Sequence, residues 1–201
     1  MVVYAVLAVV ILYLADFTSI YSYIIALVGL GLIYFYKKED YLPYIFGGAI
    51  AALTLLGIMG IFLTTRVPAV AILSGSMVHD DTTEASHYTW LEQNLGYNRS
   101  YINSWPCSNG FLIGDLAIIH GQDSYEIGDV IVFDVAGETI PIIHRIIKIN
   151  DDGTYMTKGD HNTALFPFEY AVRKEQIEGK IIFIIPKLGY FKVIAGGLGV
   201  R

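Results

Sequence analysis

The sequence predicts a chain with an N-terminal membrane region followed by a mainly β domain that faces water. Three stretches without a charged residue occupy the first third of the chain, at 1–15, 17–36 and 41–65. Most charged residues come later, among short runs rich in Ile and Val that turn residues separate. Hydrophobic residues make up 54% of the 201, which is a high share for a purely soluble domain. We therefore expect a membrane region over 1–65 and a β domain over 66–186.

The second and third uncharged stretches are long enough to cross a bilayer as helices. A helix rises about 1.5 Å per residue, and the hydrocarbon core is about 30 Å thick. Met1–Ala15 would cover only about 22 Å, so it is a short span, a tilted neighbour or a signal-like apolar segment. We therefore expect two or three transmembrane helices. Lys37 and Lys38, between the second and third stretches, favour the cytoplasmic side, which places the chain from Arg66 onward outside the cytoplasm.

Short β-branched runs with Gly and Asp turns predict antiparallel strands in the second part of the chain. A polar and aromatic segment, 79–111, comes before most of them, and we expect it to form an inserted lid with a short helix near 84–95. The tail, 187–201, is apolar with interspersed basic residues and can lie on the membrane surface or begin a further span. The strands are expected at 116–120, 130–135, 140–149, 154–157 and 177–185.

Charge and cysteine content exclude several classes of function. The formal net charge of −6 argues against nucleic-acid binding, which needs a basic face. Cys107 is the single cysteine, so no internal disulfide can form. His79, His87 and His120 include no pair of histidines one helical turn apart. We therefore expect no metal and no cofactor.

Three residues in chain order can form a catalytic serine site. Ser76 follows the third apolar stretch in Ser74-Gly75-Ser76-Met77, and a serine nucleophile needs a neighbouring base. His144 interrupts a β-branched run, where stiff backbone would hold its ring. Asp160 lies in a polar turn and can orient an imidazole. Each residue also has a plainer interpretation, as a linker serine, a structural histidine and a turn aspartate.

These features occur within five sequence boxes that are in the same order as in one known family. The chain resembles the type I signal peptidases, in the branch found in archaea and in the endoplasmic-reticulum complex. The resemblance covers nearly all of the β domain and none of the membrane region. The boxes are Ser74-Gly75-Ser76-Met77, Gly114-Asp115-Leu116-Ala117-Ile118-Ile119, Gly128-Asp129-Val130-Ile131-Val132-Phe133, Pro141-Ile142-Ile143-His144-Arg145-Ile146-Ile147 and Thr157-Lys158-Gly159-Asp160-His161-Asn162.

The resemblance implies a role for each residue of the candidate site. Ser76 is similar to the family's nucleophile, and its backbone N–H would help to form the oxyanion hole. The Ser74 hydroxyl is similar to the side-chain oxyanion donor of bacterial relatives. His144 stands where bacterial members have a lysine base, and Asp160 matches the aspartate of this branch. A Ser-His dyad, with Asp160 serving only the structure, stays open beside the triad.

The chain also departs from the family pattern in three places. His79 stands where the family commonly has proline, and the segment 79–111 makes this chain longer than compact members. Some members use a second aspartate six residues after the first, and here that position is Phe166. Glu169 is the nearest carboxylate, and whether it substitutes is left open. Glu169 and Asp129 are therefore auxiliary candidates.

The implied function is that of a multi-pass membrane serine endopeptidase with its catalytic domain on the extracytoplasmic side of the cell membrane. Its substrates would be secretory preproteins with small residues before the scissile bond, and it would associate with the bilayer and with the translocation machinery. The alternative is a non-catalytic membrane-anchored protein of the same fold that binds extended peptides. In that case Ser76→Ala and His144→Ala would leave function unchanged, while changes near Trp90 and Trp105 would abolish binding.

Overall fold

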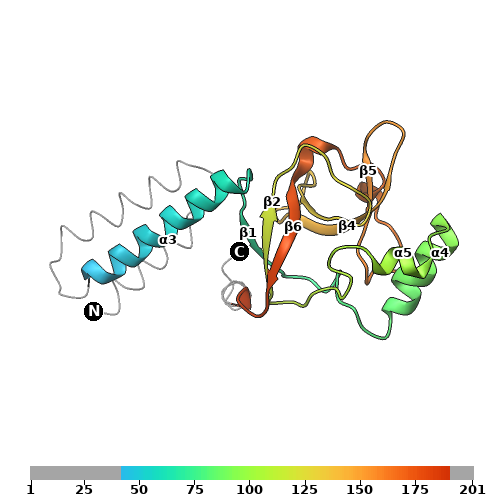
Figure 1. Ribbon diagram of the computed structural model, residues 1–201, viewed down its shortest axis with the longest axis horizontal. Coiled ribbons are helices and arrows are strands. Elements are labelled where there is room, and N and C mark those ends of the chain that lie inside the picture. Colours follow the sequence, from blue (N-terminus) through green and yellow to red (C-terminus); the bar gives the residue numbers. More distant parts are fainter. Residues whose placement is uncertain (1–41, 191–201) are drawn as a thin grey trace. The chain divides into compact units, whose positions relative to one another are not determined.

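The computed structural model describes residues 42–190, and the chain divides into two compact units, Met1–Pro68 and Ala69–Arg201. In the first unit, helix α3 runs over Leu42–Phe62 (Figure 1). Within the described part of the chain, no helix combines the length and the apolar character needed to cross a membrane. The apolar stretches predicted at 1–15 and 17–36 lie outside the described residues, as does the tail beyond Tyr190.

The second unit is built on a six-stranded antiparallel sheet with the strand order β1-β2-β6-β3-β4-β5 (Figure 1). This confirms the prediction of a mainly β domain. Two predicted strands, 116–120 and 177–185, have the bounds that the structure gives them, and three others differ at their ends. β1 escaped prediction because three residues carry too little alternation to be recognised. The strands are β1 (Ala69–Ala71), β2 (Leu116–His120), β3 (Val130–Phe133), β4 (Ile142–Ile149), β5 (Tyr155–Lys158) and β6 (Ile177–Ile185).

Strand β4 lies between β3 and β5, and its successive side chains face opposite sides of the sheet. Ile146 belongs to one core cluster, with Ile131 and Phe133 of β3. Ile147 belongs to another cluster, with Leu91, Ile102 and Trp105. All these side chains are at least 95% buried. Consecutive residues of β4 therefore reach different surroundings, which separates His144 from its neighbour Arg145.

The inserted segment 79–111 is packed against the sheet. It contains the π-helical turn η1 (Glu84–Thr89), helix α4 (Trp90–Leu95) and helix α5 (Arg99–Asn103), and α4 and α5 are seen together at the lower right of Figure 1. The helix predicted near 84–95 is therefore present, but its first half is π-helical. Its apolar residues pack on Ile147 of β4, so the segment is part of the folded core.

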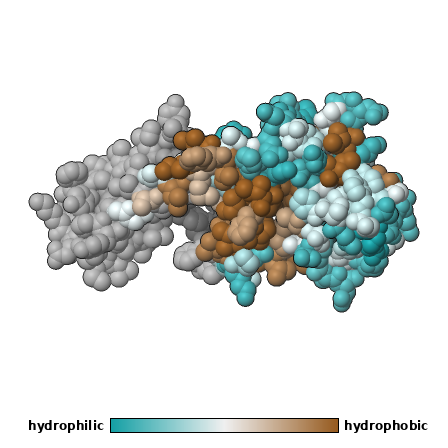
Figure 2. Space-filling model, viewed as in Figure 1, coloured by the Kyte–Doolittle hydropathy of each residue, from teal (hydrophilic) through white to brown (hydrophobic). Residues whose placement is uncertain are grey.

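Exposed apolar side chains gather over β2, β6 and the loops near them. Figure 2 shows this surface in brown, whereas the part of the same view that carries the inserted segment is largely hydrophilic. The apolar residues of the surface include Leu112, Ile113, Phe183 and Leu188, each exposed by 40% or more. Two short 3-10 turns, η2 (Pro167–Glu169) and η3 (Lys174–Gln176), follow β5. The first of these turns supplies a residue of the candidate site.

Candidate active site

The candidate nucleophile lies in a tight turn that follows β1. The Val78 N–H donates to the Gly75 carbonyl over 3.0 Å, so Ser76 is a central residue of this turn. Ser76 is half-buried, whereas the next side chain, Met77, is 1% exposed and anchors the turn in the core. The Ser76 and Ser74 hydroxyls are 3.2 Å apart, within hydrogen-bonding distance. The turn therefore presents two hydroxyl groups side by side on a fixed backbone.

The imidazole ring of His144, a residue of β4, is held in place by the carboxylate of Glu169. The Nδ1 of His144 lies 2.5 Å from Oε1 of Glu169, and the two side chains are 5% and 0% exposed. The other oxygen of Glu169 accepts the Phe166 N–H over 2.6 Å, at the start of η2. A carboxylate at Nδ1 requires that nitrogen to carry the proton, so neutral His144 has its lone pair on Nε2. His144 is thereby prepared to accept a proton at Nε2.

The Gly159–His161 turn contacts both the histidine and the serine loop. The His161 N–H donates to the Ser76 carbonyl over 2.8 Å. A Cβ placed on Gly159 would stand 2.5 Å from Asn162 Nδ2 and 2.9 Å from His144 Nε2, so glycine leaves room here for both side chains. One turn therefore bonds the Ser76 backbone and lies beside Nε2 of His144. Among the hydrogen bonds of the described residues none links Ser76 Oγ to His144, and such catalytic bonds often tighten only when substrate binds.

Asp160 does not pair with His144, contrary to the predicted order of the triad. Its carboxylate receives the Arg145 guanidinium, with Nε 3.0 Å from Oδ1 and Nη2 2.7 Å from Oδ2. His79 Nε2 lies 2.9 Å from Oδ2, and His87 Nδ1 lies 3.3 Å from Oδ1. Arg145 and His144 are consecutive on β4 and face opposite sides of the sheet. Asp160 is therefore on the Arg145 side, and Glu169 takes the position beside His144.

The charge on Asp160 is stabilised despite complete burial. Burial by itself would raise the pKa of this carboxyl, but the Arg145 guanidinium and the hydrogen bonds from His79 and Arg145 hold it well below its usual range. Arg145 also donates to the backbone carbonyls of Pro106, Cys107 and Gly128. The Asp160–Arg145 pair is therefore a saturated buried ion pair that links the inserted segment to the sheet.

The auxiliary candidate Asp129 is also occupied by structural partners. Its carboxylate lies 3.0 Å from Lys180 Nζ of β6, and it accepts the Glu126 N–H over 3.0 Å.

Lys158 is a second buried cation, and its ammonium donates to the carbonyls of Ser86, Gly159 and Asn162. Burial lowers the pKa of Lys158 to about 8, against the attraction of Asp160. Because three carbonyls take its three N–H groups, Lys158 holds backbone in place.

His79, His87 and Asp160 form the group of side chains that most resembles a metal site in the described part of the chain. Their potential ligand atoms all lie within 4.8 Å of one another. However, Arg145 already bonds both oxygens of Asp160. The pKa of His87 is lowered chiefly by burial, and the charges of Arg145 and Lys158 lower it further. A divalent cation would add two charges beside two cations and one carboxylate. The cluster is therefore better satisfied by hydrogen bonds than by a metal.

Sequence reasoning did not find this cluster. His79 and His87 come from the inserted segment, Arg145 from β4 and Asp160 from the turn after β5. No short spacing relates them, so only the folding of the inserted segment onto the sheet brings them together. A signal was available for Arg145, since a charged residue within an Ile-rich strand needs a buried partner.

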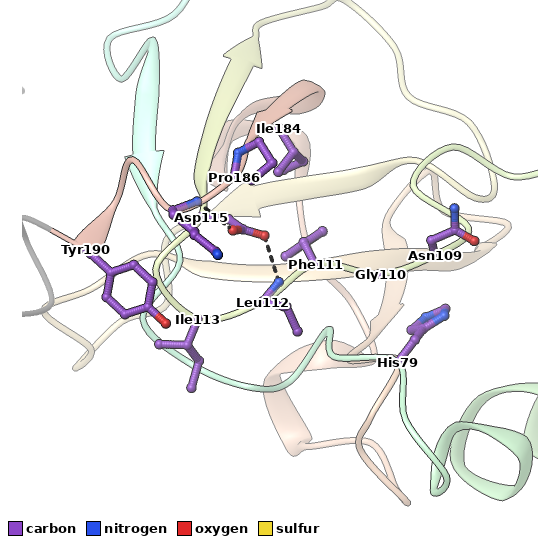
Figure 3. Close-up of a pocket in the computed structure, with 11 residues that line it drawn as sticks. His79, Asn109, Gly110, Phe111, Leu112, Ile113, Asp115, Ile184, Pro186 and Tyr190 are labelled. Carbon is purple, nitrogen blue, oxygen red and sulfur yellow. Dashed lines mark hydrogen bonds between the residues drawn. The ribbon is translucent and has the colours of Figure 1, made fainter.

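A pocket of about 450 Å³ opens on the side of His79 (Figure 3). Residues Asn109–Ile113, where the inserted segment ends and the chain runs toward β2, form one wall, and the chain at the end of β6 forms another. Leu112 N–H donates to the Asp115 carboxylate over 2.9 Å and fixes the first wall. Tyr190 and His79 are at opposite ends of the pocket in Figure 3. One end of the pocket is at His79, two residues after Met77, and most of its lining residues are apolar.

Comparisons with known proteins identify relatives of the chain, although no family model matches it. The chain is 33% identical over 99 residues to "Signal peptidase complex catalytic subunit SEC11" of Komagataella phaffii, covering 42% of this chain and 58% of the relative. The protein of the same name from Clavispora lusitaniae is 26% identical over 163 residues, or 76% of this chain and 78% of the relative. The one from Dictyostelium discoideum is 28% identical over 160 residues, with coverage of 73% and 72%. The chain thus spans little more than half the length of the first relative.

Proposed function

We propose that this chain, whose resemblance to the endoplasmic-reticulum branch of type I signal peptidases is confirmed by these relatives, is a membrane-bound serine endopeptidase. Its proposed reaction is the removal of N-terminal signal peptides from secretory preproteins after small residues. The observation that carries this proposal is the buried pair of His144 Nδ1 and Glu169 Oε1 at 2.5 Å. A turn that bonds the Ser76 backbone lies against the other nitrogen of this histidine.

The proposed acid of the triad is Glu169. Asp160, which the sequence favoured for this role, is instead proposed to keep Arg145 and the inserted segment in place. The Glu169 carboxylate holds the proton on Nδ1 and stabilises the imidazolium that forms during the reaction. A glutamate is longer than an aspartate by one methylene group, and here it reaches β4 from the short turn η2.

The proposed first step begins when His144 Nε2 takes the Ser76 hydroxyl proton. The Ser76 oxygen then attacks the carbonyl carbon of the scissile peptide bond. The electron pair of that C=O double bond moves to the carbonyl oxygen, which becomes the oxyanion. The Ser76 N–H and the Ser74 hydroxyl are the proposed donors to this oxyanion, and one such donor typically contributes about 2.7–4 kcal/mol. When the tetrahedral intermediate collapses, the C–N bond breaks and His144 gives its proton to the departing amine.

The second half of the reaction returns the enzyme to its starting state. A water molecule gives one proton to His144 Nε2, and its oxygen attacks the acyl carbon on Ser76. The ester bond breaks, the Ser76 oxygen recovers the proton from His144, and the signal peptide leaves as a carboxylic acid, which gives the second proton of the water to the solvent. Each proton that His144 takes is therefore returned, and the reaction consumes one peptide bond and one water molecule.

The proposed setting is a multi-pass protein of the cell membrane with the β domain on the extracytoplasmic side. The uncharged stretches of the sequence and the lysine pair at 37–38 support this proposal. The apolar pocket near His79 supports binding of an apolar substrate segment. Because the relatives are named as subunits of a complex, we also propose association with further subunits and with the translocation machinery.

The test of the proposal is a cleavage assay with the purified full chain in detergent and a preprotein substrate. The wild type is expected to cut after a small residue, with the site read by the masses of both products. A substrate with phenylalanine at the last signal-peptide position is expected to resist cleavage, and His144→Ala is expected to be inactive. Equal cleavage by the wild type and by His144→Ala would overturn the proposal.

A further inference from the structure

The inserted segment 79–111 is bound to the turn that joins the serine loop to the histidine. Ser86 Oγ donates to the Asp160 carbonyl over 2.9 Å, and both groups are buried. Lys158 Nζ donates to the Ser86 carbonyl over 2.5 Å. Thr82 Oγ1 lies 3.0 Å from His161 Nδ1. Together with His79 and His87, these contacts hold the turn along its length.

The apolar side chains of the segment hold it on the sheet, and this packing fixes the positions of the polar groups. Leu91, Ile102 and Trp105 pack on Ile147, two residues after Arg145 on β4. The His87 ring lies 6.1 Å from the Trp105 ring, between centroids, in an edge-on arrangement. His87 is 3% exposed, so its position follows from packing on both sides. The segment therefore transmits the rigidity of the sheet to the 159–161 turn.

The same turn determines where the reacting groups lie. It bonds the Ser76 carbonyl through the His161 N–H, and its Gly159 lies beside His144, where an added Cβ would stand 2.9 Å from Nε2. A shift of the turn would therefore change the separation of Ser76 Oγ and His144 Nε2. A misplacement of about 1 Å at reacting groups can cost about 100-fold in rate. Small movements of the turn are thus enough to affect the reaction.

We propose that the segment 79–111 is a positioning clamp for the candidate active site. Ser86 and His87 are its central positioning residues, and they act through Asp160 on the turn that carries Gly159 and His161. The segment itself contributes no reacting group. This inference rests on the proposed function for its effect on catalysis, but the clamp itself is a property of the fold that can be measured without activity.

The experiment compares three variants of the full chain in detergent. His87→Leu fills the buried position with an apolar side chain and removes the ring nitrogen that faces Asp160, whereas His87→Asn keeps a nitrogen donor near the position of Nδ1. His120→Leu is the matched control, because His120 lies in β2 and bonds Gln122 outside the clamp. Two measurements are made: amide hydrogen exchange, and kcat with KM for preprotein cleavage.

His87→Leu is expected to speed exchange of the His161 N–H while the amides of β3 keep their protection. It should lower kcat by about 10-fold to 100-fold with little change in KM. His87→Asn should recover most of both losses, and His120→Leu should match the wild type. Faster exchange throughout the sheet would mean a merely structural role and would overturn the proposal, as would unchanged exchange at His161. Zinc binding by the wild type that His87→Leu abolishes would overturn it too.

The two measurements separate this inference from the proposed function. If Ser76→Ala cleaves as well as the wild type, the serine mechanism fails, but the exchange at His161 still decides whether the clamp exists. If the wild type cleaves, Ser76→Ala does not and His87→Leu keeps the wild-type kcat, the serine mechanism stands and the clamp fails.

Discussion

Replacing Glu169 by glutamine tests how the carboxylate controls the tautomer of His144. One oxygen of Glu169 accepts the Phe166 N–H over 2.6 Å, and the other lies 2.5 Å from His144 Nδ1. In Glu169→Gln the amide oxygen keeps the Phe166 bond, so the NH2 group must face His144. An NH2 group can only donate there, which makes Nδ1 the acceptor and puts the proton on Nε2. Nε2, which must accept the Ser76 hydroxyl proton, then already carries a proton.

The expected loss is large because the wrong tautomer cannot accept the serine proton. A change of the same kind in a serine protease triad, aspartate to asparagine, lowers kcat on the order of 10⁴-fold. That factor corresponds to about 5.4 kcal/mol in activation free energy. The geometry here is similar, since the acid is fully buried and its second oxygen is fixed by backbone. We therefore expect kcat to fall by about 10⁴-fold with little change in KM.

The assay is preprotein cleavage by the full chain in detergent, with thermal unfolding measured on the same samples. Glu175→Gln is the matched control, because Glu175 is an exposed acid in η3. The variant should remain folded and lose cleavage, while the control keeps the wild-type rate. Cleavage by folded Glu169→Gln at a rate close to that of the wild type would refute the assignment of Glu169 as the orienting acid.

Three further changes probe the same region. Asp160→Asn leaves the buried Arg145 without its charged partner and should lower the free energy of unfolding in urea by about 3–5 kcal/mol; unchanged stability would contradict the buried ion pair. Burial lowers the pKa of His87 from 6.5 to about 4, so the unfolded chain takes up the proton first as the pH falls. The free energy of unfolding should therefore drop by about 3 kcal/mol between pH 6.5 and pH 4, and equally steep loss in His87→Asn would contradict this cause. Gly159→Ala places a Cβ 2.5 Å from Asn162 Nδ2 and 2.9 Å from His144 Nε2, and it should abolish most cleavage while circular dichroism stays native; full activity would show that the ring does not need this space.

The sheet was predictable from the sequence because its strands follow simple local rules. The runs at 116–120 and 177–185 are β-branched, bounded by turn residues and of ordinary strand length, and the structure gives strands with the same bounds. The helix predicted near 84–95 was also found, although local periodicity cannot distinguish the π-helical turn η1 from an α-helix. The strand β1 is too short to produce a pattern of its own.

The candidate site was predictable only in part, because its acid depends on the side of β4 that each residue faces. Ser76 and His144 could be chosen from their sequence boxes. The sequence favoured Asp160 over Glu169, since Asp160 follows a strand in a family-like turn. Only the fold shows that Asp160 meets Arg145 and that Glu169 meets His144. The three-dimensional route of the inserted segment was likewise beyond local rules.

The most direct measurement of the central claim is cleavage of a preprotein by Ser76→Ala, with Ser74→Ala beside it. The serine mechanism predicts no product above background for Ser76→Ala at wild-type thermal stability. It predicts a slower but measurable rate for Ser74→Ala, because one oxyanion donor typically contributes about 10²-fold to 10³-fold in kcat. Correct cleavage by folded Ser76→Ala at the wild-type rate would contradict the account, whatever the behaviour of the other variants.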